Sequence, residues 1–388
     1  MIILFPCVIL FVEKKDIATE KKMKKYVKIL VVSLLCVALT AGSLIPAFAM
    51  TGVEEKINAL CENINAITVY DMTADKMLFG KNENKHISIA STTKLITCLV
   101  VLSVFQPDDV ITVGQEIYLR KPNSSVCLIQ PGHKLKVRTL IAALLLPSGN
   151  DAAYTVAVNT ARKHSGQPDM SYERAVNYFC NLMNEEAKKL GCKNTYFVNP
   201  EGWDNPNHYS TAADMTKIAC AALNNAIIAS IANIHYSRFY FYSGEWIDWY
   251  NTNKLLDPES EYYYPYAHGL KTGTTSEAGK CLVAFAEKDG RKLLICAYGC
   301  KEESDRFGKV RDIFGYVYSA PVMGDADESG VIDASDARIV LRASVGLEEI
   351  TSALRAQGDV DKDGELTSSD ARTILRVAVG LEELKTAS

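Results

Sequence analysis

The sequence lacks an excess of charge of either sign and, beyond its N-terminal region, any long hydrophobic run. Its 388 residues include 42 lysines and arginines and 46 aspartates and glutamates, which gives a net charge of −4. No basic field is present of the kind that attracts nucleic acid. After residue 49, no apolar run is long enough to cross a bilayer. These absences exclude a nucleic-acid-binding protein and predict no membrane span after the N-terminal region.

Patterns of cysteine and histidine that bind zinc are missing as well. Nine of the eleven cysteines follow residue 49, and Cys296 and Cys300, four positions apart, have no second pair to complete a zinc site. Most of these cysteines lie among apolar residues, as Cys98 and Cys281 do, which favours buried thiols over disulfides even in an exported protein. The sequence therefore predicts no catalytic metal.

Residues 1–49 have the layout of a secretory signal peptide. A lysine-rich patch at residues 21–28 precedes an apolar run at 29–39, and Ala47-Phe48-Ala49 supplies an A-x-A cleavage site. Met23 lies within the patch and is a candidate for the true start. The mature protein is therefore expected to begin near Met50, to be secreted and to be soluble.

Hydrophobic periodicity predicts a mixed α/β fold from residue 64 onward. Residues 64–80 alternate as strand, turn and strand, and residues 281–298 alternate around an Asp289-Gly290 turn, which predicts two hairpins. Helices are expected at about 151–163, 171–190 and 211–225, and strands at 234–242 and 245–251.

Ser91 and Lys94 form an S-x-x-K pattern at the start of an apolar run of helical length. If the helix begins near Ser91, residues i and i+3 share one face and the Lys94 amine reaches the Ser91 hydroxyl. A serine nucleophile needs such a base, and a lysine can act as one only when burial and a second cation keep it neutral. Taken alone, the pattern more often marks a helix start with a surface lysine.

Two further short patterns follow in the chain. Ser148-Gly149-Asn150 lies between two helical segments, where the simpler interpretation is an interhelical turn. Lys271-Thr272-Gly273 precedes the second hairpin, which places Lys271 on or beside a strand of the same sheet.

In this order, S-x-x-K, S-x-N and K-T-G resemble the motif set of the D-alanyl-D-alanine carboxypeptidases among the low-molecular-mass penicillin-binding proteins. The resemblance covers roughly residues 55–320. It implies the penicillin-binding/β-lactamase-like transpeptidase fold, in which helices flank an antiparallel sheet and a second subdomain is all-α. It also implies a catalytic domain at residues 50–320 that needs no metal or organic cofactor.

The resemblance assigns a catalytic role to each of four residues. Ser91 attacks the carbonyl between two D-alanines, and Lys94 takes the serine proton. Ser148 relays a proton to the departing D-alanine, and Asn150 holds the substrate amide or the Lys94 side chain. The implied substrates are peptidoglycan stem peptides that end in D-Ala-D-Ala, and β-lactams are implied as covalent inhibitors.

The K-T-G segment is implied to bind the substrate. Lys271, Thr272 and Thr274 offer a cation and hydroxyls to the free C-terminal carboxylate, and Lys271 helps to keep Lys94 neutral. Gly273 lets a peptide lie along the strand edge. The backbone N–H groups of Ser91 and Thr274 form the oxyanion hole by the same resemblance, and loss of such a donor typically costs about 3–4 kcal/mol.

The last part of the chain, from Gly324, repeats at an offset of 34 residues. Each copy contains a loop with oxygen-bearing residues at positions 1, 3, 5, 7, 9 and 12 and a turn glycine at position 6, which is the spacing of a calcium loop. The candidate Ca²⁺ ligands are Asp325, Asp327, Ser329, Val331 (carbonyl), Asp333 and Asp336 in the first copy, and Asp359, Asp361, Asp363, Glu365 (carbonyl), Thr367 and Asp370 in the second.

Position 12 of each loop is aspartate rather than the glutamate of a calcium sensor, and an amphipathic helix follows each loop. The tandem resembles a dockerin, a small all-α module that binds a cohesin on a scaffolding protein. We assign it to residues 321–388, with structural calcium in both loops. Ala334-Ser335 and Ser368-Ser369 are expected to flank the cohesin-contacting surface.

These patterns predict a secreted serine-type D-Ala-D-Ala carboxypeptidase, extracellular or held at the cell surface through a cohesin. One alternative is a β-lactamase, which would need a glutamate to activate the deacylating water. Glu173 superficially fits, but apolar residues at helical spacing around it favour an ordinary helix face. The other alternative is a non-catalytic module that binds cell wall or β-lactams and carries a dockerin.

Overall fold

The computed structural model describes residues 52–319, 322–327, 329 and 331–384. The predicted signal peptide lies outside these residues. Within the described part of the chain no single helix is long and apolar enough to cross a membrane, although α7 (Ala212–Asn224) and α8 (Ala226–Ala232) reach that length and composition as a pair bent by 99°.

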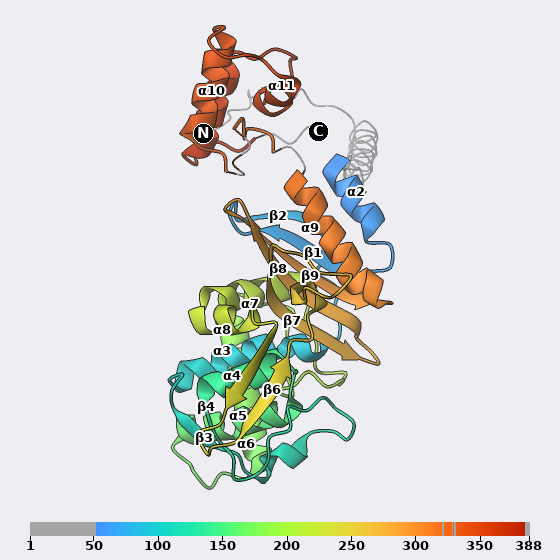
Figure 1. The fold of residues 1–388 in the computed structure, drawn as a ribbon, viewed down its shortest axis with the longest axis vertical. Coiled ribbons are helices and arrows are strands. Elements are labelled where there is room, and N and C mark those ends of the chain that lie inside the picture. The colour runs from blue at the N-terminus through green and yellow to red at the C-terminus, as the bar shows by residue number, and fades with distance from the viewer. Residues whose placement is uncertain (1–51, 320–321, 328, 330, 385–388) are drawn as a thin grey trace, which may run out of the picture. The chain divides into compact units, whose positions relative to one another are not determined.

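A five-stranded antiparallel sheet forms the centre of the catalytic region, with strand order β2-β1-β9-β8-β7 (Figure 1). The strands are β1 (Ala66–Asp71), β2 (Lys76–Lys81), β7 (Ala267–Thr275), β8 (Gly279–Lys288) and β9 (Arg291–Cys300). Both predicted hairpins are confirmed. Asp289 and Gly290 have φ of 51° and 81°, which suits the tight turn between β8 and β9. Strand β7 lies at one edge and is therefore paired on one side only.

Both faces of the sheet are covered, so its central strands are apolar at almost every position. On β8, Cys281 and Val283 belong to one hydrophobic core, and the alternate residues Leu282 and Ala284 belong to another. Helices α2 (Gly52–Leu60) and α9 (Val310–Ser319) contribute to the second core. Helices α3 (Lys94–Val104) and α7 contribute to the first.

The first core continues into a helical subdomain, as the resemblance implied. Its helices include α3 (Lys94–Val104), α4 (Val137–Leu145), α5 (Asn150–Ser165) and α6 (Tyr172–Lys189). The subdomain is not purely helical, since two short ribbons accompany it: β3 (Val110–Thr112) with β4 (Lys134–Lys136), and β5 (Tyr236–Tyr240) with β6 (Trp246–Tyr250). The second ribbon confirms the strands predicted from its aromatic residues.

The nine cysteines after residue 49 are all free thiols, and seven of them are buried. Burial raises the pKa of Cys281 to about 12, so this thiol stays protonated and unreactive near neutral pH. The predicted buried thiols are therefore confirmed for most positions.

The C-terminal module contains α10 (Ala334–Ser344), α11 (Ser352–Gly358) and α12 (Ser368–Ala378). Its hydrophobic core is small, and its eight buried members include three alanines: Ala337, Val340, Ala343, Leu354, Val360, Leu366, Ala371 and Ile374. A core of this size supplies little stability, and modules like it commonly need a metal or a disulfide.

Candidate active site

Ser91 and Lys94 lie at the junction of a 3-10 turn, η1 (Ala90–Thr93), and helix α3. The predicted helix start is confirmed, and the side chains meet as expected: Lys94 Nζ lies 2.8 Å from Ser91 Oγ. Lys94 is not a surface residue, because its side chain is completely buried. The simpler interpretation of the S-x-x-K pattern, a helix start with a surface lysine, is therefore wrong.

The other partners of Lys94 determine what its amine can do. Nζ donates to Asn150 Oδ1 at 2.7 Å and to the Glu201 carbonyl at 2.9 Å. Both partners are obligate acceptors, so they take both protons of a neutral amine. The remaining lone pair then points at the Ser91 hydroxyl, which is the geometry that a general base requires.

Burial favours the neutral form of Lys94. It lowers the pKa of Lys94 to about 8, although the nearby carboxylates of Glu201 and Asp151 oppose the shift. The pKa of Lys271 also lies well below its ordinary value, first because of burial and then because of Lys94 and Arg306. Burial rather than Lys271 is therefore the main cause of the lowered Lys94 pKa, and a bound carboxylate would raise the pKa of Lys271 again.

The Ser148-Gly149-Asn150 segment forms the sharp turn into α5. Ser148 has a φ of 62°, and its nearly buried hydroxyl makes no hydrogen bond with any residue that the structure describes. A Cβ at Gly149 would lie 2.7 Å from Asp151 Oδ1 and from Cys127 Sγ, so the turn requires glycine there. The Asp151 carboxylate accepts from the backbone N–H groups of Cys127 and Ile129 and so holds the neighbouring loop.

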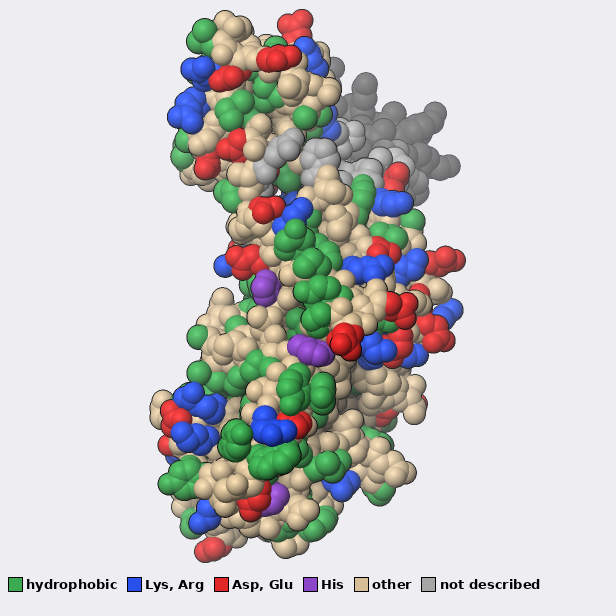
Figure 2. All heavy atoms as spheres, in the orientation of Figure 1, with side chains coloured by type: hydrophobic (Ala, Val, Ile, Leu, Met, Phe, Trp, Pro, Cys, Tyr) green, Lys and Arg blue, Asp and Glu red, His purple; other side chains and the backbone are tan. Residues whose placement is uncertain are grey.

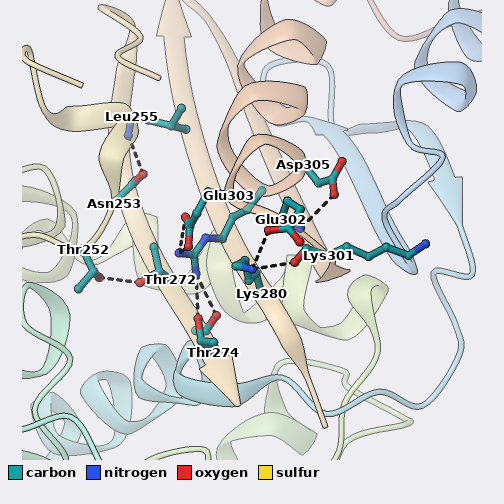
Figure 3. Close-up of polar contacts among 12 residues, drawn as sticks. Thr252, Asn253, Leu255, Thr272, Thr274, Lys280, Lys301, Glu302, Glu303 and Asp305 are labelled. Carbon is teal, nitrogen blue, oxygen red and sulfur yellow. Dashed lines mark hydrogen bonds and ion pairs between the residues drawn. The ribbon is translucent and has the colours of Figure 1, made fainter. Parts of the chain in front are cut away.

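Strand β7 brings the K-T-G residues beside Ser91. A Cβ at Gly273 would lie 2.9 Å from the Ser91 backbone nitrogen, so glycine is needed for the strand to pass this close. Lys271 is buried and donates to the Thr272 carbonyl. The Thr272 hydroxyl lies 2.5 Å from that of Thr252 (Figure 3). The structure thus brings Asn150 and the K-T-G strand, which are both distant in sequence, to Ser91 and Lys94.

Arg306 is a site residue that sequence reasoning missed. It lies in a π-helical segment, η4 (Ser304–Lys309), and donates to the Gly273 carbonyl at 3.2 Å and to Thr274 Oγ1 at 3.0 Å (Figure 3). An ion pair with Glu303, at 2.7 Å, orients the guanidinium. Arg306 therefore gives this end of β7 a cation beside the Thr274 hydroxyl, a donor set suited to a carboxylate.

Glu201 is a second residue that was missed. It is almost fully buried, and its Oε1 accepts from the Tyr154 hydroxyl at 3.1 Å. Its Oε2 is buried without a hydrogen-bond partner among the described residues. Burial raises the pKa of Glu201, and the Lys94 cation opposes that shift. Glu173, the candidate for the glutamate that would activate water in a β-lactamase, is exposed on α6.

His208 has a structural geometry. Its Nδ1 accepts from the Val198 backbone, so the neutral ring carries its proton on Nε2, which donates to Thr93 Oγ1 at 2.9 Å. Burial lowers the pKa of His208 to about 4, so the ring stays neutral near pH 7 and holds the turn next to Ser91.

In the C-terminal module, each loop gathers three carboxylates whose oxygens lie within 4.8 Å of one another. The clusters are Asp325, Asp327 and Asp336 in the first loop, and Asp359, Asp361 and Asp370 in the second. Asp327 and Asp361 are exposed, but Asp336 and Asp370 are buried, and like charges this close to a buried carboxylate are costly unless a cation neutralises them. The donor set therefore fits calcium.

Other predicted calcium ligands make contacts within the module. Asp333 and Thr367, at position 9, accept from backbone N–H groups at the starts of α10 and α12. Ser329 Oγ donates to the Val331 carbonyl at 3.2 Å. Asp363 accepts from the Glu365 backbone at 2.8 Å. These residues lie outside the two carboxylate clusters.

Comparison with known proteins bears on both parts of the chain. Residues 56–301 match the family model described as D-alanyl-D-alanine carboxypeptidase, and residues 323–376 match the dockerin type I domain. The D-alanyl-D-alanine carboxypeptidase DacF of Bacillus subtilis is 27% identical over 270 residues, which are 68% of this chain and 64% of DacF. DacD of Salmonella typhimurium is 30% identical over 293 residues, 72% of this chain and 69% of DacD.

Solved structures agree with these sequence matches. The crystal structure of the Streptomyces K15 DD-transpeptidase has a TM-score of 0.61 and 29% sequence identity, and the match covers 66% of this chain and 98% of that one. DacD from Francisella tularensis, at 22% identity and a TM-score of 0.57, shares the fold. The mixed α/β fold that the motifs implied is confirmed.

Proposed function

Because the chain belongs to the D-alanyl-D-alanine carboxypeptidase family, we propose that it removes the terminal D-alanine from peptidoglycan stem peptides through an acyl-enzyme on Ser91. The observation that carries the proposal is the hydrogen bonding of Lys94 Nζ. Two obligate acceptors direct its lone pair at the Ser91 hydroxyl, so Ser91 is the activated nucleophile.

The reaction then has two halves. Ser91 Oγ attacks the carbonyl carbon of the penultimate D-alanine while its proton passes to Lys94 Nζ. The C–N bond breaks, and the departing amine takes a proton through Ser148. Water next attacks the ester on Ser91 and releases the shortened peptide. The backbone N–H groups of Ser91 and Thr274 stabilise the oxyanion in both halves.

The substrate is selected by its free carboxylate. Arg306 provides a cation at the end of β7, Lys271 becomes a second one when a bound carboxylate raises its pKa, and Thr272 and Thr274 add hydroxyl groups. An arriving carboxylate is neutralised there, which also keeps Lys271 protonated while Lys94 stays neutral. A substrate without this carboxylate cannot make these charge-assisted hydrogen bonds, so it is disfavoured.

A synthetic pentapeptide ending in D-Ala-D-Ala tests the proposal. The expected products are the tetrapeptide and free D-alanine, with none released from the C-terminally amidated peptide. Benzylpenicillin is expected to block the reaction through a long-lived adduct. Fast turnover of benzylpenicillin would indicate a β-lactamase instead, and no release of D-alanine would indicate a non-catalytic binding module.

The rate of hydrolysis is expected to rise with pH through about 8. Lys94 acts as a base only when neutral, and burial lowers its pKa to about 8. Below that pKa most Lys94 is protonated, so kcat/KM for the pentapeptide falls about tenfold for each further pH unit. The measurement is a kcat/KM profile between pH 6 and pH 9, and a flat profile would contradict Lys94 as the base.

Glu201→Gln is expected to move the rising part of that profile to lower pH. The Glu201 carboxylate raises the pKa of Lys94, so removing its charge lowers that pKa. The Tyr154 hydroxyl can still donate to the amide oxygen of glutamine. Glu173→Gln, on the exposed face of α6, is the matched control and leaves the profile unchanged. An unmoved profile in the Glu201 variant would exclude this electrostatic role.

Arg306→Gln is expected to raise KM for the pentapeptide by about 10- to 100-fold, because a charge-assisted hydrogen bond contributes about 1.5–3 kcal/mol. Steady-state kinetics measure the effect. Arg311→Gln removes an arginine that contacts the Glu261 carbonyl and Asp312 on α9, and it serves as the control with wild-type KM. Equal KM values for the two variants would remove Arg306 from the carboxylate site.

We also propose that residues 50–320 form the catalytic domain and that residues 321–388 form a calcium-dependent dockerin that binds a cohesin. The match to the dockerin type I domain and the two carboxylate clusters support this. Ala334 and Ser368 are exposed at the starts of α10 and α12, at equivalent positions of the two copies. A dockerin and the predicted signal peptide together support our proposal that the enzyme acts outside the cell, attached to a scaffolding protein.

A further inference from the structure

The outer face of the β5–β6 ribbon carries four exposed aromatic side chains. Cross-strand pairing places Tyr236 opposite Tyr250 and Tyr240 opposite Trp246, and these side chains are 43–69% exposed. Between the two pairs lies Arg238 opposite Asp248. Figure 2 shows hydrophobic side chains gathered over this ribbon, with one basic and one acidic side chain among them. We call these six residues the aromatic platform.

The platform is rigid. Arg238 makes two hydrogen bonds to the Asp248 carboxylate, at 2.8 and 2.9 Å, and its guanidinium lies 3.9 Å from the centre of the Trp246 ring. The rings of Tyr236 and Tyr250 are 4.6 Å apart. Side chains held in this way lose little conformational entropy when a ligand binds.

The inner face of the ribbon fixes the platform to the active site. Trp249 is buried, and its indole N–H donates to the Cys127 carbonyl at 3.0 Å. Asp151, next to Asn150, holds the Cys127 backbone. At the end of β6 the chain continues to Thr252, whose hydroxyl contacts Thr272 on β7. The platform is therefore joined to both sides of the candidate site.

The chemistry of the platform suits a sugar chain. A large exposed aromatic surface marks a binding site, and flat rings stack on the C–H faces of sugars. The only charges on the platform, Arg238 and Asp248, cancel each other, whereas a nucleic-acid site needs an excess of positive charge. The two aromatic pairs are four residues apart along each strand, about 13 Å, so one extended polymer can contact both.

We propose that the aromatic platform binds the glycan strand of peptidoglycan and presents the attached stem peptide to Ser91. This rests on the proposed function, because the stem peptide is covalently joined to that glycan and brings it to the active site. The sugar rings stack on the Tyr240–Trp246 and Tyr236–Tyr250 pairs. Arg238 and Asp248 supply a donor and an acceptor for hydroxyl and amide groups between them.

The test compares wild type with a Tyr240→Ala/Trp246→Ala variant. Tyr196→Ala, which removes an exposed tyrosine elsewhere in the domain, is the control. Calorimetry with the hexamer of N-acetylglucosamine is expected to show binding by wild type and control, and at least about tenfold weaker binding by the double variant. D-alanine release from intact cell walls is expected to fall in the double variant, while release from the soluble pentapeptide stays unchanged.

Three outcomes overturn the inference: equal hexamer affinity in wild type and double variant, no measurable hexamer binding by wild type, or tighter binding of a glucose hexamer, which would indicate a plant polysaccharide. The soluble pentapeptide separates this failure from failure of the proposed function. If wild type releases D-alanine from it, the activity stands whatever the platform binds.

Discussion

Ser91→Ala is expected to lower the release of D-alanine from the pentapeptide by about 10⁴-fold or more. The variant removes the hydroxyl at which the lone pair of Lys94 points and leaves the carboxylate site of Lys271 and Arg306 intact. Loss of a serine nucleophile that works with a positioned base removes nearly all of the catalysis. A D-alanine assay on purified protein measures the effect.

Ser103→Ala is the matched control for this prediction. Ser103 lies on the same helix α3, and its hydroxyl donates to the Val100 carbonyl rather than to any residue of the site, so its loss leaves the site unchanged. Wild-type activity is expected in the Ser103 variant. Comparable activity in the Ser91 and Ser103 variants would show that another group carries the reaction.

Removal of calcium by a chelator is expected to unfold the C-terminal module and abolish cohesin binding while hydrolysis continues. A ligand at one hundred times its Kd stabilises the folded state by about 2.7 kcal/mol, so two loops together supply about 5 kcal/mol. That is comparable with the whole stability of a small domain. Among the residues that the structure describes, the core of this module has eight buried apolar members, so we expect it to depend on the metal.

Circular dichroism, a cohesin pull-down and the D-alanine assay on the full chain test this prediction together. An Asp359→Asn/Asp361→Asn variant removes two carboxylates of the second cluster and is expected to need more calcium to fold. Asp169→Asn, at an exposed position of the catalytic domain, is the control. If chelator also stopped hydrolysis, the division of the chain near residue 320 would be wrong.

The parts of the site that could be predicted are those encoded by short spacing. Ser91 and Lys94 are one helical turn apart, so helix geometry alone places the amine at the hydroxyl. The calcium loops recur at an offset of 34 residues, which identifies them as a repeat. Within each loop, local turns bring the carboxylates together. The neighbouring hairpin predicted that Lys271 lies on or beside a strand of the same sheet. The resemblance implied that this segment binds the substrate that Ser91 attacks.

The parts that could not be predicted arrive from distant segments. Arg306 reaches Thr274 only after the β8–β9 hairpin has returned the chain to the same end of the sheet, and no local pattern marks it. Glu201 lies in a loop that reaches Lys94, and its backbone carbonyl, rather than its side chain, accepts the hydrogen bond from Lys94. Position 273 requires glycine because the Ser91 backbone passes close to it, and that contact forms only in the packed structure.

Electrostatic causes were also only partly predictable. Burial and a second cation, Lys271, were both expected to keep Lys94 neutral, and the sequence could not say which of the two dominates. In the structure Lys94 is fully buried, and burial is the main cause of its lowered pKa. Burial at a helix start depends on what the other segments place over it, and here those segments bring Asn150 and Glu201.

The central claim, that Ser91 is the nucleophile of an acyl-enzyme, is tested most directly by peptide mapping after reaction with benzylpenicillin. Trypsin is expected to release residues 86–94 with one covalent penicilloyl group, which fragmentation assigns to Ser91 rather than Ser88. Lys271 and Arg306 hold the carboxylate of the drug as they hold that of the substrate. An unmodified 86–94 peptide together with an adduct elsewhere in the chain would contradict the account.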